Sequence, residues 1–312
     1  MRSRPLGKTG LTVSELAIGT WGLSGDAYGP VAESERDKVI DRALSLGITL
    51  FETADVYGDG AMERCLGERL RETPALVVTK IGTNRHASPP RKQFDRAYLE
   101  EAFEKSRERL GKDVLDVVLL HNPAASTVTT GEATGALASL KAAGKLRAWG
   151  VSVGSVEVAR AALAQGAEVL SLAHNVLFST DLAELADEIH AANVGLLAHS
   201  VLAHGLLTGY WSLHKEFPPG DHRADRWTPD ELRRRLGQQG PIRSIVGGEI
   251  LTQRAASLRY VLANGLVSSV LLGAKSVVQL DQLVREAGRP PYLTKQHLES
   301  LEFRLKALGV KK

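Results

Sequence analysis

The chain has 312 residues, of which 43% are hydrophobic and 24% charged, values typical of a globular protein rather than a disordered or fibrous one. Lys and Arg total 39 against 36 Asp and Glu, and the net charge of +3 gives no support for a nucleic-acid partner. The single cysteine, Cys65, excludes an internal disulfide and favours a reducing cytoplasm. No apolar run resembles a secretory signal or reaches the ~18 residues of a membrane span, so no membrane partner is expected.

Short β-branched runs alternate with longer amphipathic segments along the chain, a pattern typical of a parallel sheet with crossover helices. The first segment predicts a β-hairpin over about residues 3–13, which would plug the bottom of a barrel. Eight strands are expected, at Leu16–Gly19, Thr49–Thr53, Leu76–Lys80, Val114–Leu120, Ala148–Ser152, Val169–Leu172, Val194–Ala198 and Val267–Leu271. Helical spacing of apolar residues is found in Ser34–Leu46, Ala97–Leu110, Ala133–Ala143, Val156–Gln165 and Asp181–Ala191.

About eight such units favour one (β/α)8 barrel domain over residues 1–312, with a C-terminal helix after the last strand. The main alternative, a doubly wound dinucleotide-binding fold, requires a glycine fingerprint directly after an early strand. Gly58-Asp59-Gly60 is followed by Ala61-Met62-Glu63 and does not complete it. The largest irregular region, at about residues 205–248, interrupts the seventh unit. An insertion of this kind is more often a substrate or cofactor loop than a linker.

Four polar side chains lie at or just after the carboxyl ends of neighbouring predicted strands, where barrel enzymes place their reacting groups. They are Glu52, Tyr57, Lys80 and His121. An ordinary tyrosine has a pKa near ~10, and we expect the Lys80 ammonium to lower the pKa of Tyr57. Glu52 would keep Lys80 charged, and His121 would donate a hydrogen bond to a carbonyl oxygen as negative charge develops on it. Together these groups predict a proton-donating site.

Each of these residues alone is more often structural than catalytic, and their shared position is what favours chemistry. His199 and His204 lack an acidic ligand at metal spacing, so no metal site is expected. Trp21 is either a core aromatic or the wall of an apolar pocket, and its rim position favours the pocket. After the last strand, Lys275 and Ser276 would bind a cofactor phosphate, although Ser276 is equally typical of a helix N-cap.

Several ordered motifs resemble those of the aldo-keto reductases, NAD(P)H-dependent oxidoreductases that fold as (β/α)8 barrels. The matching segments span nearly the whole chain: Leu6–Ser14 with Gly19-Thr20-Trp21, Phe51–Gly58, Val78-Thr79-Lys80, Leu120–Pro123, Trp149–Ser152, Ala203–Gly209 and Gly273–Ser276. The resemblance implies a catalytic tetrad of Glu52, Tyr57, Lys80 and His121. The family carries an aspartate five residues before the tyrosine, which is the position of Glu52 and not of Asp55.

The resemblance also implies a nicotinamide cofactor. Its expected binding residues are Gly19, Thr20, Trp21, Ser152, Ser171, His199, Ser200, Leu202, Gly205, Gly273, Lys275, Ser276, Gln279 and Gln282. Several family positions are altered: Val153 replaces an asparagine, Ser171 a glutamine, His199 a tyrosine or tryptophan, and Leu283 an asparagine. These changes predict weaker or less selective cofactor binding.

The resemblance and the site residues together predict a cytoplasmic carbonyl reductase or alcohol dehydrogenase that prefers NADP(H), with NAD as a second option. Hydride would pass between the nicotinamide and the carbonyl carbon of a small-molecule aldehyde, ketone or alcohol, while Tyr57 donates the proton. A different interpretation, motivated by the altered pocket, is a non-enzymatic or vestigial nucleotide-binding subunit that senses redox state. Retention of Tyr57, Lys80 and His121 favours the enzyme.

Overall fold

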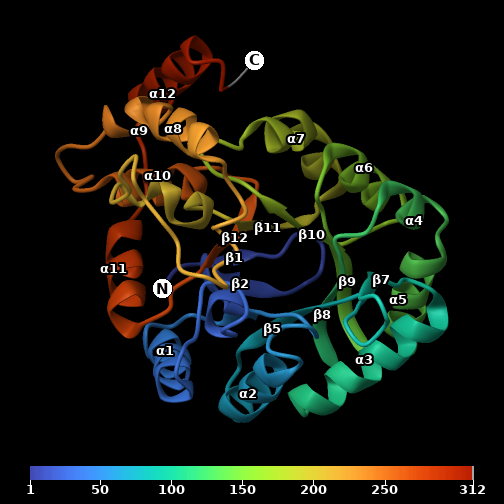
Figure 1. Ribbon diagram of the computed structural model, residues 1–312. Coiled ribbons are helices and arrows are strands. Elements are labelled where there is room, and N and C mark those ends of the chain that lie inside the picture. Colours follow the sequence, from blue (N-terminus) through green and yellow to red (C-terminus); the bar gives the residue numbers. More distant parts are fainter. Residues whose placement is uncertain (311–312) are drawn as a thin grey trace.

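Eight parallel strands close into a barrel in the computed structural model, which describes residues 1–310 (Figure 1). The strands are β3 (Leu16–Gly19), β4 (Leu50–Glu52), β5 (Leu76–Ile81), β8 (Leu115–His121), β9 (Leu146–Ser152), β10 (Val169–Ala173), β11 (Gly195–His199) and β12 (Val267–Leu272). They follow one another around the barrel in chain order, and β12 pairs with β3 to close it. The predicted (β/α)8 fold is therefore confirmed, and the ends of each strand lie within about two residues of the predicted ones.

Helices surround the barrel (Figure 1) because each has an apolar face that packs against the strands. They are α1 (Glu33–Ser45), α2 (Ala61–Leu70), α3 (Arg96–Leu110), α4 (Ala125–Thr129), α5 (Glu132–Ala142), α6 (Val156–Ala164), α7 (Thr180–Ala192), α10 (Gln253–Leu262), α11 (Val277–Ala287) and the C-terminal α12 (Lys295–Ala307). Ser155, Thr252 and Ser276 begin α6, α10 and α11 as N-caps whose hydroxyl groups accept backbone N–H bonds. Within residues 1–310, no helix combines the length and apolar character needed to cross a bilayer.

The carboxyl ends of the eight strands meet at one rim of the barrel, because all the strands run in the same direction. The register places Gly19 beside Glu52 and His121 beside Ser152. A short 3-10 segment, η1 (Thr20–Leu23), and a small hairpin of β6 (Thr83–Asn84) and β7 (Arg91–Lys92) extend from this rim. The fold therefore gathers side chains from distant segments at one edge.

The N-terminal hairpin closes the opposite end of the barrel. Its strands, β1 (Ser3–Pro5) and β2 (Thr12–Ser14), pair antiparallel. Leu6, Leu11 and Val13 are buried together with the side chains that fill the barrel interior. Gly7 has a φ of +52° and lies so close to the start of β11 that a Cβ would come within 2.2 Å of the Gly195 nitrogen. The absence of a side chain at Gly7 therefore allows the hairpin to pack directly against the start of β11.

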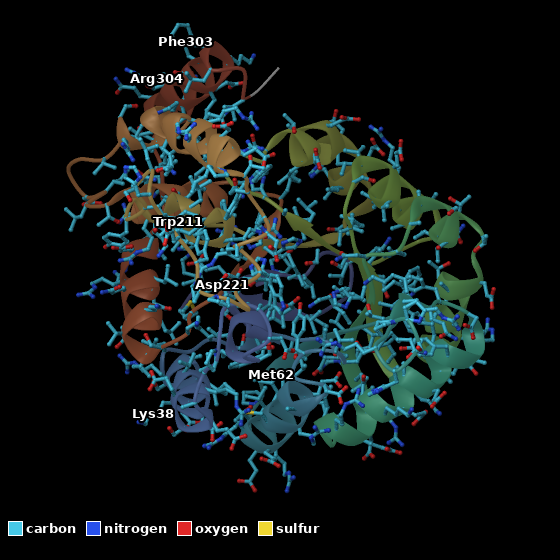
Figure 2. All side chains as sticks on the ribbon, viewed as in Figure 1. Lys38, Met62, Trp211, Asp221, Phe303 and Arg304 are labelled. Carbon is cyan, nitrogen blue, oxygen red and sulfur yellow. The ribbon has the colours of Figure 1, made fainter. Side chains whose placement is uncertain are left out.

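The insertion at residues 205–248 is more ordered than the sequence suggests. After the 3-10 segment η2 (Ala203–Thr208) it contains α8 (Pro229–Gly237) and α9 (Gly240–Arg243). Leu232 and Ile242 of these helices pack with Leu301 of α12 in a second apolar core. The part of the insertion that carries Trp211 and Asp221 lies on the inner side of α11, toward the barrel (Figure 2).

Candidate active site

Lys80 contacts the groups that were predicted to act with it. Its ammonium forms an ion pair with the Glu52 carboxylate and donates a hydrogen bond of 2.7 Å to the Thr53 carbonyl oxygen. The same nitrogen lies 4.8 Å from the centre of the Tyr57 ring. Lys80 and Glu52 are only 3% and 6% exposed. The carboxylate therefore holds a buried ammonium against the tyrosine.

Glu52 reaches Lys80 because it ends β4, which pairs with β5. Asp55, three residues further along the chain, instead donates its backbone N–H to the Lys80 carbonyl oxygen at 3.0 Å. The structure thus places the side chain of Glu52, rather than that of Asp55, against the ammonium.

His121 ends β8 and faces the edge of the Tyr57 ring. The two ring centres are 6.1 Å apart and the ring planes lie at 85°. The Nδ1 atom of His121 is buried, and nothing in residues 1–310 forms a hydrogen bond with it. Buried polar atoms nearly always have a partner, so this atom is available to a bound molecule.

Burial controls the ionisation of these groups. It lowers the pKa of Lys80 and of His121 well below their usual values. It also raises the pKa of the Tyr57 hydroxyl, and the charges of Tyr28 and Asp55 act in the same direction. The expected lowering of the tyrosine pKa is therefore wrong, because burial disfavours the phenolate and so raises the pKa. At neutral pH Tyr57 retains its proton and His121 is neutral.

An aromatic cluster continues the rim beyond Tyr57. The Trp21 ring, in η1, stacks on Tyr57 with ring centres 6.5 Å apart and lies 5.4 Å from Tyr28 and 4.6 Å from His222. The Tyr28 hydroxyl and His204 Nδ1 form a hydrogen bond of 2.9 Å. Burial lowers the pKa of His204 to about 3 and that of His222 to about 4. Both imidazoles are therefore neutral at pH 7.

Residues 221–223 fasten the insertion across this cluster. The backbone N–H of His222 donates to the Ala27 carbonyl oxygen at 2.9 Å, and Arg223 forms an ion pair of 2.6 Å with Asp221. The Arg223 guanidinium lies 4.9 Å from the centre of the Tyr28 ring. A Cβ on Gly205 would come within 3.5 Å of the same guanidinium. Residues 221–223 therefore pack against the aromatic cluster and against Gly205, the predicted cofactor residue at the start of the insertion.

The residues predicted around the nicotinamide lie at the ends of β9, β10 and β11. Ser152 and Ser171 are paired in the register, and the Ser152 hydroxyl donates to Asn122 Oδ1 at 2.8 Å. His199 Nδ1 lies 3.0 Å from the Ser200 hydroxyl oxygen, and burial lowers the pKa of His199 to about 4. These side chains are brought to one part of the rim, where a neutral imidazole is available for stacking.

The predicted phosphate-binding residues lie where β12 leads into α11. Ser276 is the N-cap of α11 and accepts a hydrogen bond from the Gln279 N–H. The Gln279 side chain in turn accepts from the Lys275 N–H at 2.9 Å, and the Lys275 ammonium donates to the Tyr28 carbonyl oxygen at 2.6 Å. Gln282 accepts a bond of 3.2 Å from Arg254. Lys275 thus joins the helix N-terminus to the aromatic cluster.

Comparison with known proteins identifies this arrangement. A model of the Aldo/keto reductase family matches residues 15–301. The chain belongs to the aldo-keto reductase family. Membership establishes an oxidoreductase family and a nicotinamide cofactor for that family, while the substrate has to be inferred from this chain's own residues.

Individual relatives of this aldo-keto reductase match it over most of their length. Pyridoxal 4-dehydrogenase from Microbacterium luteolum is 28% identical over 322 residues, covering 90% of this chain and 91% of that protein. The NADP(+) aldo-keto reductase yakc from Schizosaccharomyces pombe is 28% identical over 284 residues, covering 87% and 83%. The structure of the glycerol dehydrogenase AKR11B4 from Gluconobacter oxydans superposes with a TM-score of 0.84 at 25% identity, covering 98% and 95%.

The rim offers polar atoms that fit the family's cofactor. Thr20 Oγ1 and His121 Nδ1 are buried, and neither has a hydrogen-bond partner in the part of the chain that the structure describes. Apart from its chain neighbours, no residue in 1–310 comes within 4 Å of the place where a Cβ on Gly273 would stand, so the backbone there is open to a phosphate. The aldo-keto reductase site can therefore receive a nicotinamide nucleotide.

Sequence reasoning missed the loop residues that complete the rim. Tyr28, Asn122, His222 and Arg223 were not predicted, although each contacts a predicted site residue or a neighbour of one. For His222 and Arg223, which lie in the insertion, the usable signal was its aromatic content, which includes Trp211, Phe217 and Trp227. Their positions show no period, so the sequence did not indicate which of them face the barrel.

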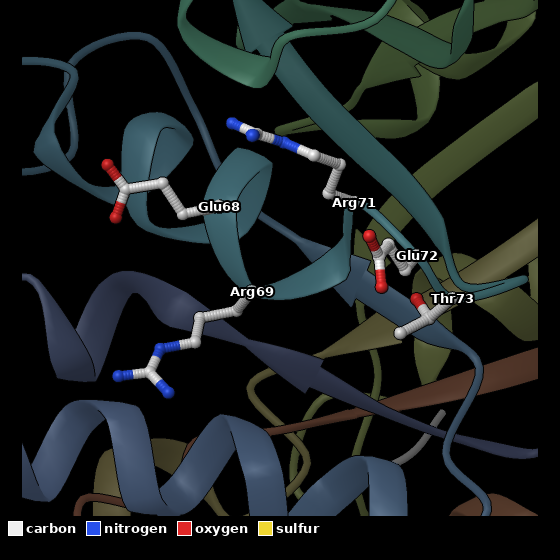
Figure 3. A pocket seen from close by; sticks show the side chains of 5 residues that line it. All are labelled: Glu68, Arg69, Arg71, Glu72 and Thr73. Carbon is white, nitrogen blue, oxygen red and sulfur yellow. The ribbon is translucent and has the colours of Figure 1, made fainter.

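A surface hollow of about 360 Å³ lies away from the tetrad, at the end of α2 (Figure 3). It is lined by Glu68, Arg69, Arg71, Glu72 and Thr73. Arg69 is already paired with Asp37 and Asp41 of α1. The hollow is therefore a feature of a charged surface, and the candidate active site remains the barrel rim.

Asp55 is a half-buried residue, and one oxygen of its carboxyl group is buried without a partner in the described part of the chain. Its Oδ1 atom has no hydrogen-bond partner within residues 1–310. Burial raises its pKa to about 7, and the Glu63 carboxylate adds to the effect. An unfolded aspartate has a pKa near ~3.9. Between these values the native chain holds a proton that the unfolded chain has lost, so the free energy of unfolding falls as pH rises from about 4 to about 7.

We therefore expect Asp55→Asn to stabilise the fold at alkaline pH and not at acid pH. Asparagine keeps the shape of the neutral acid and cannot ionise. The free energy of unfolding should rise by about 2–4 kcal/mol near pH 8 and change little near pH 4, measured by urea unfolding. The matched control is Asp59→Asn, which removes an exposed carboxylate from the same loop. An equal effect of the Asp55 variant at both pH values would contradict the interpretation.

Proposed function

We propose that this aldo-keto reductase is an NADP(H)-preferring carbonyl reductase or alcohol dehydrogenase that acts on a small-molecule aldehyde, ketone or alcohol. The observation that carries the proposal is the Lys80–Glu52 ion pair held against Tyr57, with His121 at the edge of the same ring. A buried ion pair is weak support for stability. Perturbed groups gathered at a barrel rim favour a catalytic role instead.

The side chains of the tetrad have different roles in the transfer of the proton. Tyr57 remains protonated because burial raises its pKa, and it donates this proton to the carbonyl oxygen during reduction. The Lys80 ammonium offsets the negative charge that then develops on the phenolate. His121, which is neutral, donates a hydrogen bond to the same carbonyl oxygen. The nicotinamide supplies or accepts the hydride when it is bound.

Other rim residues are proposed to orient the cofactor. Ser152, Ser171 and His199 would hold the nicotinamide ring, and Lys275 with Ser276 would hold the phosphate of the adenosine end. The name of the Schizosaccharomyces pombe relative includes NADP(+), which supports the same cofactor here. Packing of the insertion residue His222 against Trp21 would shield the reacting atoms from water.

Consumption of NADPH with simple aldehydes, followed by absorbance, tests the proposed activity. We expect saturable turnover by the parent protein, and a decrease of kcat by about 10²–10⁴-fold in Tyr57→Phe. Binding of NADPH without turnover of any aldehyde or alcohol would refute the enzyme and favour the nucleotide-binding subunit.

We also expect NADPH to bind more tightly than NADH. Charge-assisted contacts of Lys275 and Ser276 with a 2′-phosphate would contribute about 1–3 kcal/mol. Fluorescence titration gives the two Kd values, and Lys275→Gln should remove most of the difference between them. Equal affinity of the parent protein for both cofactors would defeat this assignment.

A variant of Glu35 gives a second test of the proposed phosphate-binding site at the start of α11. One of its carboxylate oxygens lies 3.2 Å from the backbone nitrogen of Val277, in the first turn of α11. A negative charge there opposes a phosphate at the helix N-terminus. Glu35→Gln should therefore tighten the binding of NADPH and leave the Kd of NADH nearly unchanged, the opposite of the Lys275 variant.

A further inference from the structure

The β6–β7 hairpin is fixed against the tetrad. Gly82, which precedes it, has a φ of +112° and lies against Phe94, where a Cβ would come within 2.1 Å of the ring. In the loop of the hairpin, Arg85 donates a hydrogen bond of 2.7 Å to the Val56 carbonyl oxygen, next to Tyr57. The hairpin is thus held at its base and at its loop, and the position of its last strand residue, Lys92, is defined.

The Lys92 ammonium lies beside the catalytic histidine. It donates hydrogen bonds of 2.7 Å to the His121 carbonyl oxygen and of 2.7 Å to the Thr83 hydroxyl. Both acceptors are uncharged, and no carboxylate within residues 1–310 forms an ion pair with Lys92. An ammonium has three N–H donors, so one of them is left for a ligand.

Two other cations near the tetrad have carboxylate partners. The pairs are Lys80 with Glu52, and Arg85 with Asp26 at 3.6 Å. Lys92 differs from them because its charge is not balanced by a direct contact in the described chain.

The carboxyl group that acts on Lys92 over a longer distance does not neutralise it. Burial lowers the pKa of Lys92, and Asp55 only partly opposes this effect. Asp55 itself has a pKa raised by burial to about 7, so it is incompletely ionised at neutral pH. Burial lowers the pKa of Lys80 and that of His121, and the positive charge of Lys92 lowers both further. The positive charge of Lys92 therefore acts on the groups of the tetrad.

We propose that the substrate carries an anionic group, a carboxylate or a phosphate, which Lys92 binds while the carbonyl group faces Tyr57 and His121. This inference rests on the proposed function. The Lys92 side chain is exposed, so its remaining N–H donor can form a charge-assisted hydrogen bond with a substrate anion. Lys92 would then determine substrate specificity, and the reacting groups would remain those of the tetrad.

Two matched pairs of aldehydes test the inference with NADPH at saturation. Succinic semialdehyde is compared with butanal, and glyceraldehyde 3-phosphate with glyceraldehyde. We expect kcat/KM for at least one anionic aldehyde to exceed that of its neutral partner by about tenfold or more. The pair with the larger ratio identifies carboxylate or phosphate as the group bound. Lys92→Gln should bring this ratio close to one, mainly through KM, and Lys92→Arg should retain most of it.

Arg91→Gln is the matched control. It removes the same charge from the same strand, and neighbouring strand residues point to opposite faces, so the ratio should be retained. A ratio near one in the parent protein would overturn the inference. The inference would also be overturned if Lys92→Gln lowered kcat/KM equally for the anionic aldehyde and its neutral partner. That result would mean that Lys92 only supports His121. Failure to reduce any of the aldehydes would instead refute the proposed function.

Discussion

Lys80→Met should reduce kcat by about 10²–10⁴-fold, the range of general acid–base effects. Methionine fills a similar volume at a position that is only 3% exposed, but it removes the ammonium that lies 4.8 Å from the centre of the Tyr57 ring. The phenolate that forms when Tyr57 gives up its proton would then lose its nearest positive charge. Single-turnover reduction of a simple aldehyde measures this step directly, and the Kd of NADPH should stay close to that of the parent.

The Lys80 variant also leaves Glu52 without its partner. An uncompensated buried carboxylate costs about 3–5 kcal/mol, so the Tm is expected to fall. The double variant Lys80→Met, Glu52→Gln removes that cost and should recover the Tm without recovering kcat. A kcat near that of the parent in either protein would remove Lys80 from the mechanism.

Glu52→Gln should lower kcat by about 10²-fold at neutral pH. Burial already lowers the pKa of Lys80, and the Glu52 carboxylate is the charge in contact with its ammonium. Glutamine keeps the length of the side chain and removes that charge, so Lys80 would lose its proton at lower pH. In the reduction direction the alkaline limb of the pH profile of kcat should move to lower pH.

Glu52→Asp separates charge from length. It restores the residue that the family usually carries and keeps the carboxylate, so kcat/KM with simple aldehydes should match or exceed that of the parent. If the surroundings have instead adapted to glutamate, the shorter side chain would draw Lys80 away from Tyr57, and a displacement of ~1 Å can cost about 10²-fold. Full activity of Glu52→Gln with an unchanged pH profile would make Glu52 a packing residue.

The barrel and its rim could be predicted from the sequence because each strand is a short apolar run that ends at a recognisable residue. β8 ends at His121 and β9 at Ser152. Since the strands are parallel, their carboxyl ends share one rim. This rule alone brings Glu52, Lys80 and His121 together, and the position of Tyr57 in the loop that follows Glu52 adds the fourth residue.

Contacts between loops could not be predicted in the same way. The hydrogen bond between Tyr28 and His204 joins residues that are 176 positions apart, and neither lies in a periodic segment. The direction of the Tyr57 pKa shift depends on how completely its hydroxyl is removed from water, which no spacing of residues reveals. The carboxylate of Glu35 at the start of α11 was missed for the same reason, because α1 and α11 meet only in the folded chain.

The hairpin that closes the far end of the barrel also offers a point for oriented attachment to a solid support. Lys8 is exposed in its turn, and its backbone N–H is bound to the Asn193 carbonyl oxygen, at the pole opposite the tetrad. The one native thiol, Cys65, is buried, and burial raises its pKa to about 11, so it reacts poorly at neutral pH. Lys8→Cys would therefore introduce a uniquely reactive thiol. A protein coupled to a bead or an electrode through it would turn its catalytic rim toward the solution.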